Sequence, residues 1–167
     1  QFQWFNRPTY IYPVVPATAA TMLRNAGHAV GWLDGIAAEW SRAEFDTKLR
    51  EFAPEVLFME TKTPVVKTHW EIIKQFKESF PAAVLVLAGD HVTAFPEESM
   101  RAAPIDYLLT GGDYDFLLLN LVNHLANGEA LEAGIWLRGT DGAPVSTGAF
   151  ELNHDLNKAP WIDRDLT

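Results

Sequence analysis

The chain has 167 residues, of which 48% are hydrophobic and 21% charged, a balance that suits one globular domain with a sizeable core. Its net charge of −9 opposes binding to nucleic acid and to anionic membranes, and no basic stripe offsets it. The absence of cysteine excludes disulfides, thiolate catalysis and a cysteine-held iron–sulfur cluster within these residues. No apolar run approaches the ~18–20 residues that span a bilayer, and no signal peptide is evident, so we expect a cytoplasmic protein.

After an aromatic, irregular stretch over residues 1–13, helix and strand patterns alternate. In chain order we predict a helix over 17–25, a strand over 29–33, a helix that begins with the capping-box pair Ser41 and Glu44, and a strand over 56–59. A helix that carries Trp70, Ile73, Phe76 and Phe80 follows, then a strand over 83–88, a short helix over 96–103 and a strand over 105–109. The last predicted elements are a helix over 114–126 and a hairpin of 135–138 and 143–146 around Asp141-Gly142.

Strands that alternate with helices through short connections indicate a Rossmann-like, flavodoxin-like α/β fold. We expect a doubly wound, mainly parallel sheet with helices on both of its faces. Such sheets normally open with a buried strand before the first helix, and residues 1–13 supply none, so we expect the first strand to be missing from the chain. Residues 1–150 are predicted to form the domain and residues 151–167 an extended linker.

Ligands of such sheets bind beyond the carboxyl ends of the strands, where four predicted loops carry small or hydroxyl residues. The candidate binding residues in these loops are Asp34, Glu60, Thr61, Lys62, Thr63, Gly89, Asp90, His91, Val92, Thr110, Gly111 and Gly112. Phosphate-binding loops, dinucleotide-binding glycine motifs and nucleophile elbows are absent from the sequence. The residues therefore indicate a binding domain that is not catalytic by itself.

Several of these side chains have two interpretations. His91 could bind a ligand or a metal, or it could cap the following turn. Asp34 could hold a ribose hydroxyl or cap its own turn, and Glu60 and Lys62 could pair inside a pocket or on the surface. The other histidines lack the spacing of metal ligands and are expected to be structural or exposed: His28, His69, His124 and His154.

Five segments, in the correct order, resemble the cobalamin-binding domain of cobalamin-dependent radical SAM enzymes. The helix-one signature of that domain is similar to residues 13–30, and its third-strand segment to residues 52–64. Its Gly-Gly-Pro-His-Val segment resembles Ala88-Gly89-Asp90-His91-Val92, and its strand and acidic turn resemble residues 105–115. Residues 159–166 look like the junction that precedes the radical SAM barrel.

The resemblance implies that cobalamin lies over the carboxyl ends of the strands and faces a radical SAM barrel C-terminal in the same polypeptide. That barrel would bind SAM and a [4Fe-4S] cluster through cysteines beyond Thr167, and the parent enzyme would catalyse methylation or a related radical rearrangement or cyclisation. The Asp-x-His-x-x-Gly motif that ligates cobalt is absent, which implies base-off cobalamin packed by Trp4, Phe5 and Tyr10.

Two alternatives remain open. Asp90 stands where the family has proline, and Asp113-Tyr114-Asp115 alters the acidic turn, so the chain could be a degenerate docking domain that binds no cofactor. A receiver-like signalling domain is the other alternative. It would need an acidic cluster around a phosphorylated aspartate and a lysine after the fifth strand, whereas Glu60 and Thr110-Gly111-Gly112 occupy those places.

Overall fold

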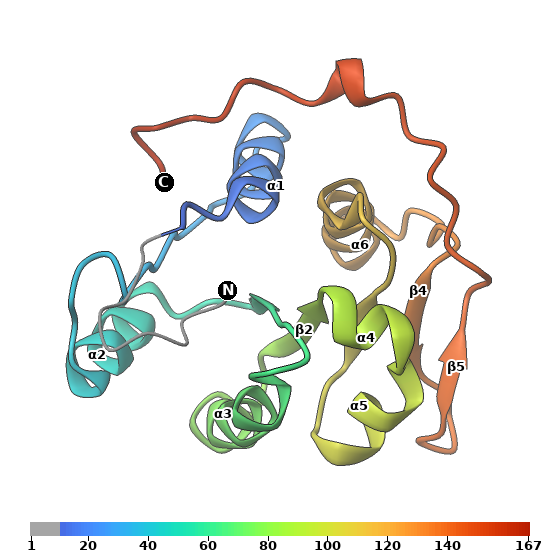
Figure 1. The fold of residues 1–167 in the computed structure, drawn as a ribbon, viewed down its shortest axis with the longest axis horizontal. Helices are drawn as coiled ribbons and strands as arrows, with labels where there is room; N and C mark the ends of the chain where they lie inside the picture. Colours follow the sequence, from blue (N-terminus) through green and yellow to red (C-terminus); the bar gives the residue numbers. More distant parts are fainter. Residues whose placement is uncertain (1–10) are drawn as a thin grey trace.

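The computed structural model describes residues 11–167, and these contain a five-stranded mixed sheet (Figure 1). The strands lie in the order of the sequence: β1 (Val56–Glu60), β2 (Val84–Ala88), β3 (Tyr107–Leu109), β4 (Ile135–Arg138) and β5 (Pro144–Ser146). β1, β2 and β3 are parallel, whereas β4 runs antiparallel to β3 and forms a hairpin with β5. The mainly parallel sheet is therefore confirmed, with an antiparallel hairpin at one edge.

Helices cover both faces of this sheet (Figure 1). One face carries α1 (Val14–Asn25) and α6 (Tyr114–Asn127), which pack against each other. The other face carries α2 (Arg42–Phe52), α3 (Val66–Ser79), α4 (Asp90–Ala94) and α5 (Pro96–Ala102). This two-sided cover is that of a Rossmann-like α/β fold. None of the helices within residues 11–167 is long and apolar enough to cross a membrane.

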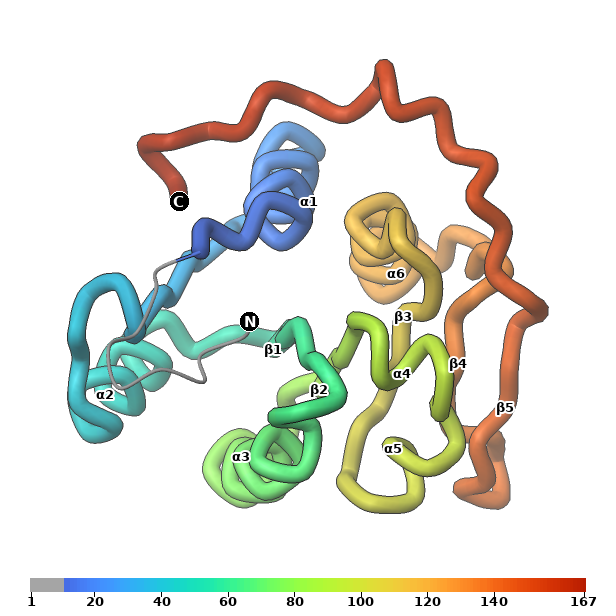
Figure 2. Tube along the Cα trace, viewed as in Figure 1, coloured from blue at the N-terminus to red at the C-terminus, as the bar shows by residue number. Residues whose placement is uncertain are grey.

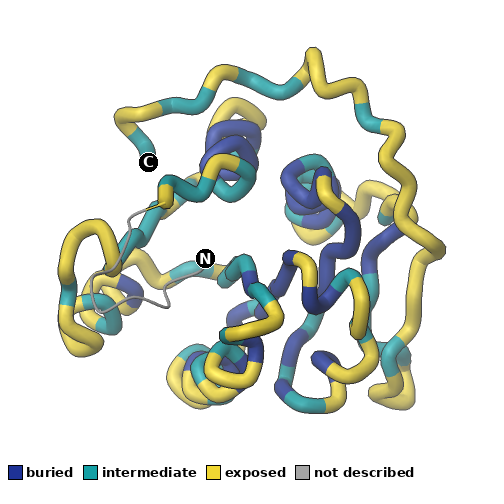
Figure 3. The backbone as a smooth tube through the Cα atoms, viewed as in Figure 1, coloured by how far each residue is buried: buried dark blue, intermediate teal, exposed yellow. Residues whose placement is uncertain are grey.

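Alternate side chains of β2 separate two hydrophobic cores. Leu85 and Leu87 join the core on the side of α3, whereas Val86 and Ala88 join the core formed with α1 and α6. This alternation is the two-residue period of a strand. Because both faces of β2 are covered by a core, its residues form a continuous apolar run. Figure 3 shows buried residues concentrated in the centre of the sheet and on the inner sides of the helices.

Residues 29–33 do not form the predicted strand, so that prediction is wrong for the described structure. The segment has no regular secondary structure, and its backbone makes no hydrogen bond with another strand within residues 11–167. It connects α1 on one face with α2 on the other face, and it passes the outer edge of β1 at a distance (Figures 1 and 2). A strand needs a neighbour to satisfy its backbone groups, and none of the described strands lies beside it.

The C-terminal tail, residues 149–167, leaves β5 and runs past α6 to α1 (Figure 2). It contains a short 3-10 helix, η1 (Leu156–Lys158), and otherwise has little regular structure. Near its end, the Asp163 backbone N–H donates to Thr21 Oγ1 at 3.0 Å, and the Asp163 carboxylate pairs with Arg24. The predicted linker therefore contacts the domain, while the predicted division at residue 150 stays a prediction.

Candidate functional site

The loops that follow β1, β2 and β3 meet at one end of the sheet, which we call the carboxyl edge. It comprises residues 60–63, 89–92 and 110–113. The sequence-predicted residues divide there into two groups by burial. Those open to solvent, wholly or partly, are Glu60, Lys62, Thr63, Asp90 and Gly112; those buried behind them are Thr61, Gly89, His91, Val92, Thr110 and Gly111. The structure thus brings the three loops together, but only part of each loop faces outward.

Lys62 joins the first two loops through two carboxylates. Its Nζ lies 3.0 Å from Glu60 Oε1 and 3.3 Å from Asp90 Oδ2. Partial burial of Lys62 disfavours its charged form, but the two carboxylates outweigh this effect and raise the pKa of the lysine. Lys62 therefore stays protonated, and because two carboxylates surround its one ammonium group, the cluster as a whole is negatively charged.

Gly89 sits where the first two loops cross. Its φ is +118°, and a Cβ built there would lie 2.1 Å from the Thr61 carbonyl oxygen. The Thr61 N–H extends the strand ladder by donating to the Ala88 carbonyl at 2.8 Å. The Thr61 hydroxyl lies 3.0 Å from His69 Nδ1, and burial lowers the pKa of that histidine. Thr61 and Gly89 therefore form a rigid floor for the edge.

His91 points away from the carboxyl edge into the core. Its ring lies between Trp70 and Phe95, at centroid distances of 5.7 Å and 5.4 Å. Neither ring nitrogen has a hydrogen-bond partner among residues 11–167, and Glu98 Oε2 lies 3.7 Å from Nε2. The His91 imidazole is therefore buried behind the open part of the edge. No group of three metal-ligating side chains exists within the described range.

The third loop is partly covered by the C-terminal tail. Thr110 Oγ1 donates to the Gly134 carbonyl at 2.7 Å, and the Phe150 ring lies against Gly111, 2.8 Å from the place of a Cβ. Gly112 remains exposed, and a Cβ there would meet only Leu152, at 3.9 Å. Phe150 could not be predicted at this loop, because it is far from Gly111 along the chain and reaches it only after the β4–β5 hairpin.

A cleft of ≈ 760 Å³ opens beside β1 and ends at this edge. Its lining includes Asp34, Glu60 and Lys62. Asp34 caps its own turn, because its Oδ1 accepts from the N–H groups of Ile36 at 3.2 Å and Ala37 at 2.9 Å. Glu60 and Lys62 thus pair within a cleft and not on the open surface, and Asp34 caps its own turn. The predicted aromatic contacts Trp4, Phe5 and Tyr10 lie outside the described residues.

Tyr114 places a further polar group behind the edge, at the start of α6. Its ring packs against Phe58 with the ring centroids 5.8 Å apart, and its hydroxyl is buried. Burial, and next to it the negative charge of Glu60, raises the pKa of this phenol far above its usual range. Tyr114 is therefore a neutral hydroxyl at every physiological pH. From the sequence, Tyr114 was placed in the altered acidic turn at the start of a helix, and its proximity to Glu60 was not predicted.

The open part of the edge fits a flat ligand that carries hydrogen-bonding amides. Gly112 lets a planar group approach the backbone closely, and the carboxylates of Glu60 and Asp90 can accept hydrogen bonds from amide groups. Lys62 holds the two carboxylates in place. Cobalamin is a ligand of this kind, because its flat corrin ring carries amide side chains. With His91 buried, none of the candidate residues at the edge offers an imidazole as a ligand for cobalt.

Comparisons with known proteins follow the same direction. No protein-family model matches the chain. An uncharacterised methyltransferase of Pyrococcus horikoshii is 26% identical over 120 residues, which cover 72% of this chain and 26% of the relative. The anaerobic magnesium-protoporphyrin IX monomethyl ester cyclase of Cereibacter sphaeroides is 29% identical over 101 residues, which cover 60% of this chain and 16% of the cyclase. The chain thus spans about a quarter or less of these relatives.

Solved structures match the chain over more of its length. The radical S-adenosylmethionine methyltransferase TsrM from Kitasatospora setae, with cobalamin and a [4Fe-4S] cluster bound, has a TM-score of 0.67 at 21% identity, over 90% of this chain and 28% of its own. The same enzyme with tryptophan and a SAM analogue gives 0.67 at 21% identity, over 83% of this chain and 28% of its own. The structural neighbours thus come from the class that the sequence resemblance named, and the predicted Rossmann-like α/β fold is confirmed.

Proposed function

We propose that the chain is the cobalamin-binding domain of a radical SAM enzyme, and that it holds base-off cobalamin across the carboxyl edge. The observation that carries the proposal is the open part of this edge, where exposed Gly112 lies beyond the sheet together with the Glu60–Lys62–Asp90 cluster. Its fold neighbour TsrM has been solved with cobalamin bound, which supports the same class of ligand.

In this proposal the chain's own residues bind and orient and take no part in bond making. Glu60 and Asp90 accept hydrogen bonds from the ligand's amides, Lys62 holds these two carboxylates in place, and Thr63 adds a hydroxyl beside them. Thr61, Gly89 and Thr110 hold the floor of the edge in place from behind. When bound, cobalamin would supply a cobalt centre for methyl transfer or radical chemistry.

We further propose that a radical SAM barrel follows residues 151–167 in the same polypeptide, in the cytoplasm. SAM and the [4Fe-4S] cluster would belong to that barrel, because the present chain has no cysteine. The substrate would be bound mainly by the barrel. Methylation, cyclisation and related radical rearrangements are all compatible with the domain proposed here.

The decisive experiment is to titrate the natural protein, purified without oxygen, with hydroxocobalamin and to record the visible spectrum after desalting. We expect one cobalamin per chain with a base-off spectrum. A protein that stays colourless would refute cobalamin binding and would favour the degenerate docking domain. A base-on or histidine-ligated spectrum would refute the proposed mode of binding.

A pair of leucine substitutions tests where the cofactor lies. Gly112→Leu projects a side chain from the exposed carboxyl edge, where only Leu152 lies near the new Cβ, so the fold tolerates it while the approach of a planar ligand is blocked. Ala143→Leu is the matched control, because it is exposed in the β4–β5 hairpin at the opposite end of the sheet. We expect at least about a tenfold loss of affinity for Gly112→Leu, which corresponds to about 1.4 kcal/mol, and no change for Ala143→Leu. Equal affinities would refute this location.

A further inference from the structure

Tyr114 buries a hydroxyl group that does not stabilise the fold. The residue is 3% exposed, and its hydroxyl has no hydrogen-bond partner among residues 11–167. A buried hydroxyl without a partner destabilises a folded protein, and a phenylalanine would fill the same space without this penalty. Because nearly all buried polar side chains have a partner, such an exception needs an explanation. The hydroxyl of Tyr114 is available to a bound molecule.

The packing of the Tyr114 ring determines where this hydroxyl lies. The ring contacts Phe58 on the face of the sheet that carries α1 and α6, with the ring centroids 5.8 Å apart. Because alternate residues of a strand share a face, Glu60 follows Phe58 on this face, closer to the carboxyl edge. Burial raises the pKa of the phenol most, and the nearby charges of Glu60 and, more weakly, Asp90 raise it further. The hydroxyl therefore lies beside the Glu60–Lys62–Asp90 cluster.

The cluster and the hydroxyl differ in the hydrogen bonds that they can make. Glu60 and Asp90 carry carboxylates, which accept hydrogen bonds, and the Lys62 ammonium group lies between them. Tyr114 adds a neutral hydroxyl, which can donate. A ligand group that reaches this point therefore meets an acceptor, the Glu60 carboxylate, next to a donor, the Tyr114 hydroxyl.

This pair of protein groups matches a primary amide. The NH2 group of an amide donates and its carbonyl oxygen accepts, and both are attached to the same carbon atom. A carboxylate of the same shape has two acceptors and no donor, and its negative charge is repelled by Glu60 and Asp90. A site that hydrogen-bonds one polar group strongly rejects an analogue without that group, because the buried partner is then left unpaired.

We propose that Tyr114 is a specificity-determining residue of the carboxyl edge, where its hydroxyl donates to the carbonyl oxygen of a ligand amide while the Glu60 carboxylate accepts from the NH2 group of the same amide. This inference rests on the proposed function, in which the amide-bearing ligand is cobalamin. It adds that the edge distinguishes one amide side chain of the corrin ring from a carboxylate in the same place. Lys62 holds Glu60 in position for this contact.

The first test uses the natural protein without ligand. Tyr114→Phe removes the hydroxyl and keeps the ring on Phe58, and no hydrogen bond among residues 11–167 is lost. We expect this variant to resist urea at least as well as the wild type. Tyr107→Phe is the matched control, because Tyr107 packs against the same core from the first position of β3, at the opposite end of the sheet. A urea midpoint for Tyr114→Phe below those of the wild type and the control would show a structural role for the hydroxyl and overturn the proposal.

The second test compares the affinities of the natural protein for hydroxocobalamin and for the derivatives in which one amide side chain is hydrolysed to a carboxylate. We expect Tyr114→Phe to bind hydroxocobalamin at least about fivefold more weakly and Tyr107→Phe to bind it as the wild type does. One derivative should bind the wild type at least about tenfold more weakly than hydroxocobalamin does. Glu60→Gln should narrow this difference, because glutamine can donate to the carboxylate of that derivative.

Equal binding of hydroxocobalamin by the Tyr114→Phe and Tyr107→Phe variants would overturn the proposal. So would a wild type that binds every derivative as tightly as hydroxocobalamin, or a weakly bound derivative whose deficit persists in Glu60→Gln. In all three cases the wild type still binds hydroxocobalamin, and the proposed function stands. A wild type that does not bind hydroxocobalamin would refute the proposed function and, with it, this inference.

Discussion

At the scale of single residues, Gly89 is fixed by packing inside the protein. Its left-handed φ of +118° disfavours any side chain, and a Cβ would overlap the Thr61 carbonyl at 2.1 Å. We expect Gly89→Ala to lower the free energy of unfolding by at least about 2 kcal/mol, because both backbone strain and overlap must be relieved. Urea unfolding followed by circular dichroism measures the loss.

Gly112→Ala is the matched control for this substitution. Gly112 belongs to the same edge, but it has no left-handed φ, and the nearest atom to its Cβ is 3.9 Å away. We expect the control to change stability by no more than about 0.5 kcal/mol. If Gly89→Ala were equally mild, the crossing of Gly89 over Thr61 would be wrong in the structure.

The three loops of the carboxyl edge were predictable from the sequence, whereas the orientation of their side chains was not. The sequence grouped the three loops correctly, because parallel strands bring their carboxyl ends together. It could not tell which side chains face outward. His91 follows β2 directly, yet α4 begins at Asp90 and turns His91 toward Trp70. Spacing along the chain does not encode that rotation, so the loops were predictable and the accessible residues within them were not.

At the scale of elements, the helix start and the hairpin turn that a few neighbouring residues specify were predictable from the sequence. Ser41 and Glu44 form the expected capping box at the start of α2, and Asp141-Gly142 lies in the turn of the expected hairpin. The strand over residues 29–33 failed for a non-local reason. Its pattern is that of a strand, but none of the strands within residues 11–167 pairs with it.

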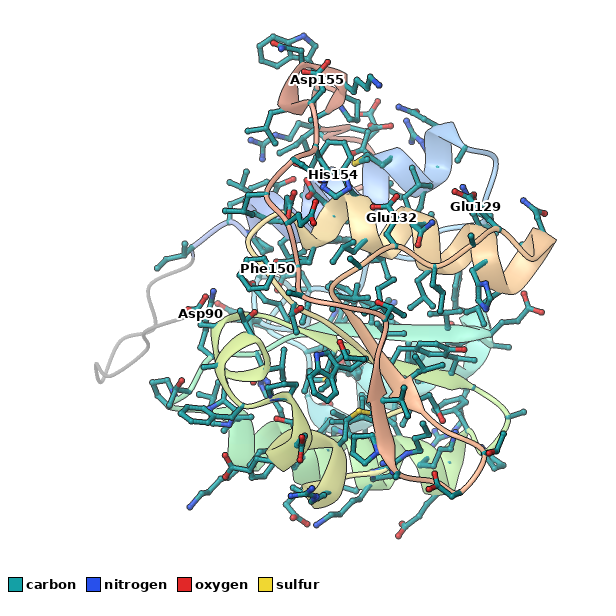
Figure 4. The ribbon with its side chains drawn as sticks, turned by 90° about the vertical axis from the view of Figure 1, so that its right-hand side faces the viewer. Asp90, Glu129, Glu132, Phe150, His154 and Asp155 are labelled. Carbon is teal, nitrogen blue, oxygen red and sulfur yellow. The ribbon has the colours of Figure 1, made fainter. Side chains whose placement is uncertain are left out.

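His154 links the C-terminal tail to α6 and to the segment after it. Its Nδ1 lies 2.5 Å from Asp113 Oδ2 and its Nε2 lies 2.8 Å from Glu132 Oε2, and its ring stacks on Phe116 (Figure 4). Partial burial opposes the charge on His154, but the two carboxylates outweigh it and raise its pKa above the ordinary 6.5. Both ring N–H groups donate when the imidazole is protonated.

This arrangement predicts a pH-dependent attachment of the tail. Because the folded pKa is raised, the stabilisation is complete below about pH 6.5 and is lost as the pH rises through the raised value. An NMR titration of the His154 ring should show the raised pKa, and Glu132→Gln should lower it. Glu129→Gln is the control, because Glu129 accepts from Asn120 and leaves His154 unchanged. An equal effect of both substitutions would refute the specific pairing with Glu132.

At the scale of the whole molecule, the tail runs from β5 back to α1 and contacts it. The sequence indicated an extended linker and gave no sign that it contacts the first helix, because those contacts join residues more than 130 positions apart. Thr21 is central to them. It is buried in α1, where its hydroxyl donates to the Ala17 carbonyl at 2.9 Å and accepts from the Asp163 N–H at 3.0 Å.

Thr21→Val tests whether this contact holds the tail on the domain. Valine keeps the shape of threonine but leaves the Asp163 N–H without its acceptor, a loss of about 1 kcal/mol, or roughly a fivefold shift in the docking equilibrium. We expect trypsin to cleave after Lys158 and Arg164 about five times faster. Thr18→Val is the control, because the Thr18 hydroxyl donates to the Val14 carbonyl within α1 and, among residues 11–167, makes no hydrogen bond to the tail. Equal cleavage of both variants would refute the role of the Thr21–Asp163 hydrogen bond and would leave the Arg24–Asp163 pair and the His154 contacts as what holds the tail on the domain.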